Sequence, residues 1–146
     1  MGLIDDLAAG PVAVDTALFI YLIEEHPGYL AAVQPLFASA VRGERTLVTS
    51  AVTLLEVLVV PYRAGNLPLA ARYEALLANS RGVRMVELDR GQLRAAAQLR
   101  AAYRVRTPDA LQLAAALTER CSALVTNDRA FPQVSGLEVI QLSNYL

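Results

Sequence analysis

Lysine is missing from the sequence, and cysteine occurs once in 146 residues. All 13 basic residues are therefore arginines. Without lysine, the chain can form neither a P-loop nor a Schiff base, and it cannot complete the phosphotransfer site of a receiver domain. The single cysteine, Cys121, excludes a disulfide framework and a cysteine-based zinc cluster, and we expect it to be a small buried apolar residue.

Long apolar runs are absent as well. The two longest, residues 12–23 and 51–60, are too short to span a bilayer, and each contains a carboxylate. The first residues lack the basic region of a signal peptide and the Ser or Thr of a myristoylation motif, so we expect a cytoplasmic protein with no membrane partner. Hydrophobic residues make up 55% of the chain and charged residues 18%, which favours a folded core and excludes disorder.

Segments with the periodicity of strands alternate along the chain with segments that have the periodicity of helices. This pattern predicts a single α/β domain over residues 1–146, with three layers and a central, mostly parallel sheet of four to five strands flanked by helices. The ligand site of such a sheet lies beyond the carboxyl ends of its strands. We predict strands at residues 11–14, 46–49, 83–88, 123–126 and 137–142, and helices at residues 16–25, 29–42, 51–60, 68–80, 90–104 and 107–120.

The helix at residues 51–60 is apolar all round except for Glu56. This pattern predicts a helix that is buried on several sides, with Ser50 as its N-terminal cap and Pro61 at its end. Burying an unpaired carboxylate in apolar surroundings costs several kcal/mol, because the charge loses its hydration, unless the group is protonated, paired or bound to metal. The chain has no lysine to pair with Glu56.

Three further carboxylates occur at the ends of apolar segments. Asp15 follows the first predicted strand, Asp109 opens an Ala- and Leu-rich helix, and Asp128 follows the fourth strand. Asp15 and Asp128 could serve only as caps or turn residues, and the helix dipole alone favours Asp109 by about 0.3–1 kcal/mol. Their positions at strand ends and helix starts nevertheless place them with Glu56 at the edge where an α/β sheet forms its site.

Four converging carboxylates would carry a charge of about −4 and would raise each other's pKa values unless cations neutralise them. All-oxygen ligands favour Mg²⁺ or Mn²⁺ over Zn²⁺. Two such ions about 3.5–4 Å apart can direct the in-line attack of water on a phosphodiester. The residues therefore indicate metal-dependent phosphodiester hydrolysis.

Four motifs, in order along nearly the whole chain, carry a family resemblance. They are Val14-Asp15-Thr16, the segment 49–57 with Glu56 inside it, the segment 106–114 around Asp109, and the segment 124–131 with Thr126, Asn127 and Asp128. Together they resemble the PIN-domain ribonucleases of the VapC type, which are the toxins of type II toxin–antitoxin systems.

The resemblance implies a three-layer PIN-like fold and an endoribonuclease that binds Mg²⁺ or Mn²⁺ through Asp15, Glu56, Asp109 and Asp128. Asp15 and Asp109 would be the central ligands. Thr16, Thr126 and Asn127 would support these ligands without binding the metal. The alternative is a catalytically inactive PIN-like module that binds RNA or a protein. A small-molecule-binding domain is disfavoured because no Gly-rich phosphate loop follows the first strand.

The residues and the family resemblance together indicate three binding partners: RNA, a second copy of the chain and an antitoxin. Arg106 and Arg129 lie near the predicted site and could contact an RNA backbone, although the stronger interpretation is that these and the other arginines between residues 90 and 106 only solvate helix faces. The net charge of −1 provides no long-range attraction for RNA. The apolar excess favours a homodimer or a surface for a cognate antitoxin, whose basic side chain would enter the acidic pocket.

Overall fold

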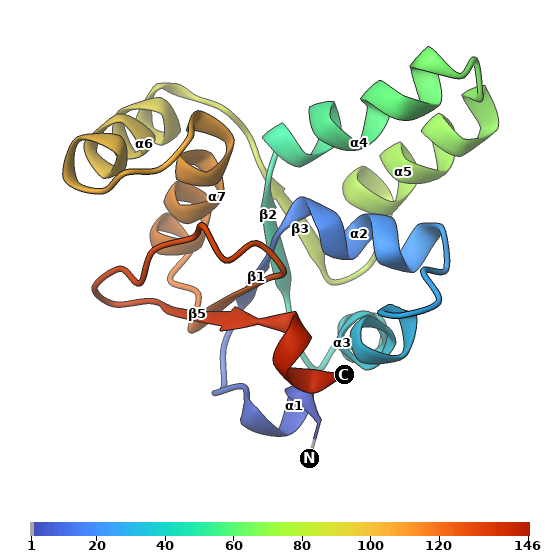
Figure 1. The fold of residues 1–146 in the computed structure, drawn as a ribbon, viewed down its shortest axis with the longest axis horizontal. Helices are drawn as coiled ribbons and strands as arrows, with labels where there is room; N and C mark the ends of the chain where they lie inside the picture. Colours follow the sequence, from blue (N-terminus) through green and yellow to red (C-terminus); the bar gives the residue numbers. More distant parts are fainter. Residues whose placement is uncertain (1) are drawn as a thin grey trace.

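Five parallel strands form the centre of the computed structural model, which describes residues 2–146 (Figure 1). The strands follow the order β3-β2-β1-β4-β5 across the sheet. In register, Val12 of β1 pairs with Leu47 of β2 and with Ala123 of β4. The strands are β1 (Val12–Val14), β2 (Leu47–Ser50), β3 (Val83–Val86), β4 (Ala123–Thr126) and β5 (Glu138–Gln141). The predicted α/β fold with a parallel sheet is therefore confirmed.

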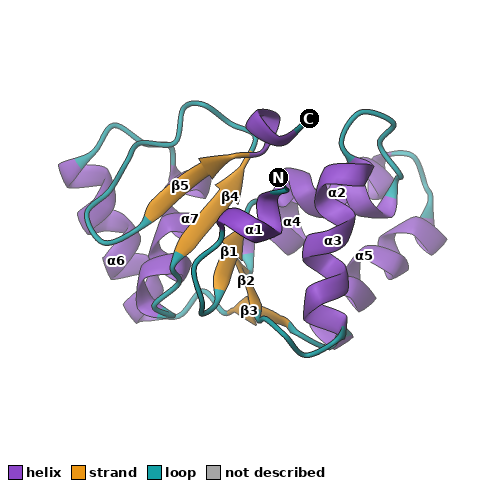
Figure 2. Cartoon of the chain, turned by 90° about the horizontal axis from the view of Figure 1, so that it is seen from below, coloured by secondary structure: helices purple, strands orange, loops and turns teal. Residues whose placement is uncertain are grey.

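Helices cover both faces of this sheet, which gives the three predicted layers. Helices α6 and α7 lie on one side, and α2, α3 and α5 lie on the other (Figure 2). A short 3₁₀ helix, Leu142–Tyr145, ends the chain. The α-helices are α1 (Leu3–Asp6), α2 (Thr16–Ile23), α3 (Leu30–Val41), α4 (Val52–Arg63), α5 (Leu67–Asn79), α6 (Arg90–Ala102) and α7 (Thr107–Thr118).

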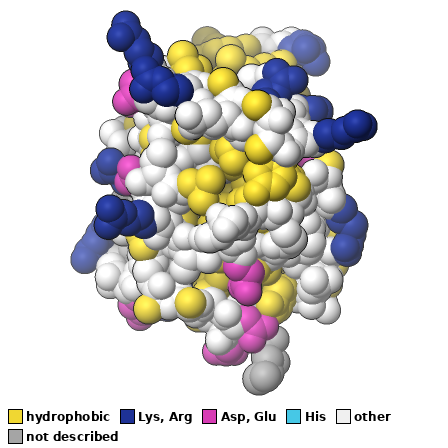
Figure 3. Space-filling view, turned by 90° about the vertical axis from the view of Figure 1, so that its left-hand side faces the viewer, with side chains coloured by type: hydrophobic (Ala, Val, Ile, Leu, Met, Phe, Trp, Pro, Cys, Tyr) yellow, Lys and Arg dark blue, Asp and Glu magenta, His cyan; other side chains and the backbone are white. Residues whose placement is uncertain are grey.

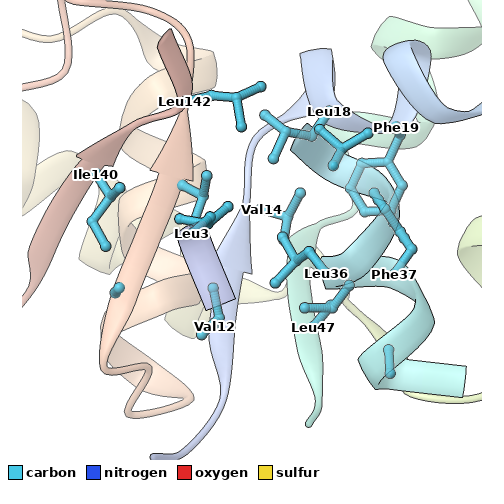
Figure 4. Packing of buried hydrophobic residues seen from close by; sticks show 14 of the residues in the cluster. Leu3, Val12, Val14, Leu18, Phe19, Leu36, Phe37, Leu47, Ile140 and Leu142 are labelled. Carbon is cyan, nitrogen blue, oxygen red and sulfur yellow. The ribbon is translucent and has the colours of Figure 1, made fainter. Parts of the chain in front are cut away.

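Alternation of side chains along the central strand β1 divides the core in two. Val12 and Val14 pack with residues of α2 and α3 in one cluster (Figure 4). Ala13 packs with α6 and α7 in the other cluster. All residues of β1 and β4 are buried, and both strands are apolar, as central parallel strands usually are, except for Thr126 at the end of β4.

The first helix was not predicted from the sequence. Leu3 and Leu7, on and next to α1, are buried against the core. The Tyr145 hydroxyl donates a hydrogen bond to Asp6 Oδ2 at 2.7 Å, so the two ends of the described chain lie together. A helix of four residues is too short to produce a recognisable periodicity, and only its tertiary contacts stabilise it.

The helix around Glu56 differs from the prediction. It continues through Pro61 to Arg63, and the side chains of Leu55 and Val60 are 65% and 66% exposed. The expectation of burial on several sides was therefore wrong, as was the end at Pro61. The Ser50 hydroxyl does accept a hydrogen bond from the Val52 amide at 3.2 Å, although Ala51 is the N-cap residue.

The strand order reverses between β1 and β4, and the carboxyl ends of these two strands are where an α/β sheet gathers its ligand site. Helix α4 contacts both α2 and α7 near this edge. Among the described residues, none of the helices has the length and apolar character needed to cross a membrane.

Candidate metal centre

Asp15 is fixed at the junction of β1 and α2 by two hydrogen bonds to its carboxylate. It is the N-cap of α2, and its Oδ1 accepts a hydrogen bond from the Thr16 amide at 2.8 Å. Its Oδ2 accepts one from the Thr126 hydroxyl at 2.7 Å. Asp15 is thus a helix cap, as one of the two interpretations predicted. This role does not exclude the other, because the same carboxylate lies at the edge of the sheet where β1 ends.

Glu56 has a partner that the sequence did not reveal. The Thr16 hydroxyl donates a hydrogen bond to Glu56 Oε1 at 2.7 Å, across 40 residues of sequence. Glu56 is half-buried, so it is neither isolated in an apolar environment nor fully solvated. This hydrogen bond connects the start of α2 to the middle of α4 and holds Glu56 against the residue that follows Asp15.

Asp109 lies in the first turn of α7 and is buried, with 7% of its surface exposed. Its Oδ2 lies 3.4 Å from Arg106 Nη2, and the same nitrogen lies 3.6 Å from Asp128 Oδ2. Arg106 is the N-cap residue of α7. A single exposed guanidinium therefore bridges two of the four carboxylates.

Asp128 follows β4 and has two functions in the structure. Its Oδ1 accepts a hydrogen bond from the Ala130 amide at 2.8 Å, which stabilises the turn, while its Oδ2 faces Arg106. Its own amide donates to the Thr126 hydroxyl at 3.0 Å. Thr126 thereby connects Asp128 to Asp15. Asn127 points elsewhere, since its Nδ2 donates to the Tyr21 hydroxyl at 3.1 Å.

The four carboxylates influence one another electrostatically. Burial raises the pKa of the Asp15 carboxyl, hydrogen bonds from Thr126 and Thr16 oppose this, and the charges of Asp109 and Glu56 raise it further. Burial also raises the pKa of Asp109; Arg106 lowers it, and the charges of Asp128 and Glu56 raise it. Burial and the neighbouring carboxylates thus both disfavour the charged forms of Asp15 and Asp109.

The chemistry of these residues fits a hard divalent cation. Throughout residues 2–146, no three His, Cys, Asp or Glu side chains are grouped closely enough to hold a metal ion as they stand. Mg²⁺, however, usually keeps several water ligands and binds through one or two carboxylates together with substrate phosphates. Buried carboxylates with raised pKa values and only one bridging arginine are the kind of donors that such an ion would stabilise.

A buried glutamine beneath the carboxylates was not predicted as a site residue. Gln112 on α7 is 2% exposed and makes hydrogen bonds to Thr16, Thr49, Thr53 and the Ser50 amide. In the sequence it lies three residues after Asp109 within an Ala- and Leu-rich helix. A polar residue at a position otherwise reserved for the core was the signal that could have identified it.

The predicted RNA-binding arginines occupy different positions. Arg106 lies at the carboxylates, whereas Arg129 donates a hydrogen bond to the Ser143 hydroxyl at 2.9 Å. The face that carries α6 has basic side chains at separate positions around its edge and apolar atoms in its middle (Figure 3). This face offers no continuous basic stripe.

A different surface is apolar. Leu55, Val59 and Tyr62 follow one another at intervals of four and three residues on α4, so they share one face of the helix. They are 65%, 40% and 56% exposed. We call these three residues the α4 stripe. Val60, in the last turn of α4, and Leu67, at the start of α5, are also exposed.

Comparison with known proteins identifies the family to which this chain belongs. The model of the PIN domain family matches residues 12–137, and the chain therefore belongs to the PIN domain family. This stretch includes all four carboxylates. A comparison with curated protein sequences found no match.

Solved structures with the same fold come from toxin–antitoxin systems. VapBC2 from Rickettsia felis, bound to a DNA fragment of its promoter, has a TM-score of 0.68 and 18% identity, covering 89% of this chain and 97% of that one. A toxin–antitoxin complex from Klebsiella pneumoniae has a TM-score of 0.64 and 23% identity, covering 86% and 94%. VapC20 from Mycobacterium tuberculosis, a toxin that cleaves the sarcin–ricin loop, has a TM-score of 0.66 and 18% identity, covering 82% and 92%. The fold is therefore that of the VapC toxins.

Proposed function

We propose that this protein, as a single PIN-like domain over its whole length, is a metal-dependent endoribonuclease and the toxin of a toxin–antitoxin pair in the cytoplasm. The observation that carries the proposal is the chain of contacts that links the four acids: Thr16 bonds to Glu56 beside Asp15, Thr126 joins Asp15 to Asp128, and Arg106 bridges Asp128 and Asp109. The raised pKa values of Asp15 and Asp109 add to it, because burial first and neighbouring carboxylates second disfavour the charged forms, and a bound cation would stabilise them.

Mg²⁺ or Mn²⁺ is the cofactor that these residues would hold. Asp15 and Asp109 would be the central ligands, and Glu56 and Asp128 would complete the site directly or through water. When bound, one such ion or a pair of them would polarise the scissile phosphate and supply an activated water for in-line attack.

The chain's own residues then have separate tasks. The Thr16 and Thr126 hydroxyls hold the Glu56 and Asp15 carboxylates in place through hydrogen bonds of 2.7 Å each. Arg106 is 73% exposed and reaches two carboxylates, so its guanidinium can turn to an RNA phosphate once a metal ion neutralises those acids. Arg129, already bonded to Ser143, would contact RNA farther from the reacting phosphate.

The structural neighbours support this activity and a protein partner. VapC20 is a toxin that cleaves the sarcin–ricin loop, and the proteins from Rickettsia felis and Klebsiella pneumoniae were solved as toxin–antitoxin complexes. The α4 stripe is a surface of the kind that such a partner, or a second copy of this chain, would cover. The acidic site would accept a basic side chain of the antitoxin.

The test is incubation of the purified chain with total RNA, with and without Mg²⁺ or Mn²⁺. We expect cleavage that requires the metal ion and that is lost in Asp109→Asn. The alternative, a catalytically inactive PIN-like module that binds RNA or a protein, is favoured only by the absence of a preformed three-residue ligand group in residues 2–146. RNA binding without cleavage at saturating metal would establish that alternative.

A further inference from the structure

Buried polar side chains form a network beneath the carboxylates, with Gln112 at its centre. Thr49 and Thr53 are fully buried beside it, and Gln112 is 2% exposed. Burying a side-chain amide is unfavourable unless its hydrogen bonds are made. Both ends of the Gln112 amide have partners, so the network is satisfied and holds a defined arrangement.

The orientation of the Gln112 amide follows from one contact. The Ser50 amide donates a hydrogen bond to Gln112 Oε1 at 3.1 Å, and a backbone N–H can only donate. The atom that faces Ser50 must therefore be the oxygen. Gln112 Nε2 then donates to Thr53 Oγ1 at 2.6 Å and to Thr16 Oγ1 at 3.3 Å.

This orientation determines where the Thr16 hydroxyl proton points. Thr16 Oγ1 accepts from Gln112, so its single proton is available to Glu56 Oε1 at 2.7 Å. A carboxylate oxygen accepts, whereas the Thr53 hydroxyl, 3.2 Å from Thr16 Oγ1, can itself donate, so the Thr16 proton is directed to Glu56. The result is a directed series of donors that ends on a carboxylate oxygen, where a hydrogen bond is stronger than between neutral groups.

We propose that Gln112 is a positioning residue for the carboxylate site, acting on Glu56 through Thr16 and thereby on metal affinity. The network joins α2, α4 and α7, which carry or begin at three of the four acids. Fixing these helices relative to one another fixes the distances between Asp15, Glu56 and Asp109. This inference rests on the proposed function of the site.

The experiment compares Gln112→Met, Thr16→Val and their double variant in the full chain. Mn²⁺ affinity is measured from the metal-dependent rise in melting temperature, and RNA cleavage is separated into kcat and KM. Loss of a group that supports a metal ligand typically weakens metal affinity about 10–100-fold. Gln112 is one hydrogen bond further from the ligand than such a group, so we expect Gln112→Met to weaken Mn²⁺ affinity about tenfold. Thr16→Ser should recover most of the affinity that Thr16→Val loses.

Two features of the data separate positioning from a general loss of stability. If Gln112 acts through Thr16, Gln112→Met should weaken Mn²⁺ binding little further in the Thr16→Val background, whereas independent effects would add. Cleavage should fall in kcat at saturating Mn²⁺ with little change in KM for RNA, since no RNA contact is removed.

Gln92→Met is the matched control. Gln92 on α6 is 6% exposed, and its Nε2 donates to the Thr118 hydroxyl at 2.7 Å, at the opposite end of α7 from Asp109. The substitution removes a buried amide and one threonine contact without touching the carboxylate network. We expect a change in melting temperature without metal and an unchanged Mn²⁺ affinity.

The outcomes are distinct. If Mn²⁺ stabilises the wild type and Gln112→Met with equal affinity, or if the effects of the two substitutions simply add, the positioning role is overturned while the proposed function stands. If Mn²⁺ does not stabilise the wild type, the proposed function fails and this inference fails with it. Should Gln112→Met not fold, equal Mn²⁺ affinities of Thr16→Val and Thr16→Ser would overturn the inference.

Discussion

The Thr126 hydroxyl donates a hydrogen bond to Asp15 Oδ2 at 2.7 Å, and this bond joins residues 111 positions apart in the sequence. The oxygen of that Thr126 hydroxyl also accepts a hydrogen bond from the Asp128 amide at 3.0 Å. One fully buried hydroxyl therefore connects the end of β4 to the residue after β1 and to a second carboxylate. The two acids at the reversal of strand order are held relative to each other by this group.

Thr126→Val should therefore destabilise the protein. The substitution keeps the shape of the side chain but leaves the Asp128 amide without its acceptor, which typically costs about 1–3 kcal/mol. Losing the bond to Asp15 also removes an interaction that lowers the pKa of that carboxyl. Urea denaturation of the metal-free protein measures the loss. Thr126→Ser, which keeps the hydroxyl, is the control, and equal stability of the two variants would show that the bond contributes nothing.

Asp15→Asn should stabilise the metal-free protein near neutral pH. The pKa of Asp15 is raised in the folded state, so folding favours its protonated form. Below the unfolded pKa of about 3.9 the residue is protonated in both states and the variants should match. As pH rises through the folded pKa, the wild type loses stability that Asn, which cannot ionise, retains. Melting temperatures of both proteins between pH 3 and pH 8, with no metal present, give the difference.

The matched control is Asp89→Asn. Asp89 is likewise an N-cap, on α6, and its Oδ1 accepts a hydrogen bond from the Gln92 amide at 2.9 Å. It lies outside the carboxylate site, so its substitution should leave metal-dependent cleavage intact. Asp15→Asn should reduce cleavage by more than the roughly 10–100-fold expected for a supporting partner. A destabilised metal-free Asp15→Asn protein would mean that Asp15 is chiefly a structural cap.

Arg106→Gln should raise the affinity for the metal ion and lower the affinity for RNA. Arg106 bridges Asp109 and Asp128 and lowers the pKa of Asp109. Without it, a metal ion no longer competes with a resident cation, so Mn²⁺ should bind more tightly in thermal titrations. RNA should bind more weakly, because a phosphate loses its guanidinium partner. Arg129→Gln is the comparison, and we expect it to leave Mn²⁺ affinity unchanged.

The fold was predictable because its strongest signals are local. Apolar strands that end in Asp15 or Asp128 and helices that end at glycine all appear in short segments of sequence, and each strand was found within two residues. Tertiary contacts decided the remainder. Helix α4 passes through Pro61 because its last turn packs against α5, and α1 forms because Leu3 can be buried. Neither contact leaves a mark in the local pattern.

The charged residues of the candidate site could be predicted from the sequence, but the neutral residues that contact them could not. A carboxylate in an apolar segment is conspicuous because its burial is so unfavourable. Gln112 gives only a weak signal, as a polar residue within an Ala- and Leu-rich helix, and Thr53 gives none. Their partnership with Thr16 could not be predicted, because these contacts span 96 and 37 residues. The position of Arg106 between two acids also depends on the distance between β4 and α7, which no spacing in the sequence specifies.

Substitutions in the α4 stripe should impair partner binding without unfolding the chain. Leu55 is 65% exposed, so Leu55→Ser removes little burial and should leave the melting temperature nearly unchanged. If an antitoxin or a second copy covers the stripe, Leu55→Ser combined with Tyr62→Ser should weaken that association, as measured by calorimetry and by mass in solution. Leu93→Ser on α6, where Leu93 is 53% exposed, is the matched control. Equal effects of stripe and control substitutions would exclude this surface.

A cognate antitoxin should compete with the metal ion for the carboxylates. Arg106 already contacts two of the four acids, Asp109 and Asp128. A guanidinium or ammonium of a partner could bind to them in the same way, so an inhibitor can act by placing a cation where the metal would bind. We expect the antitoxin's C-terminal segment to be rich in apolar residues and to contain an Arg or Lys. Its binding should weaken as Mg²⁺ or Mn²⁺ rises, by more than NaCl of equal ionic strength causes, because simple screening acts on all exposed charges alike. Calorimetry at several metal concentrations, repeated with Asp15→Asn, measures this competition, and an affinity independent of metal would mean that the partner covers or distorts the site without occupying it.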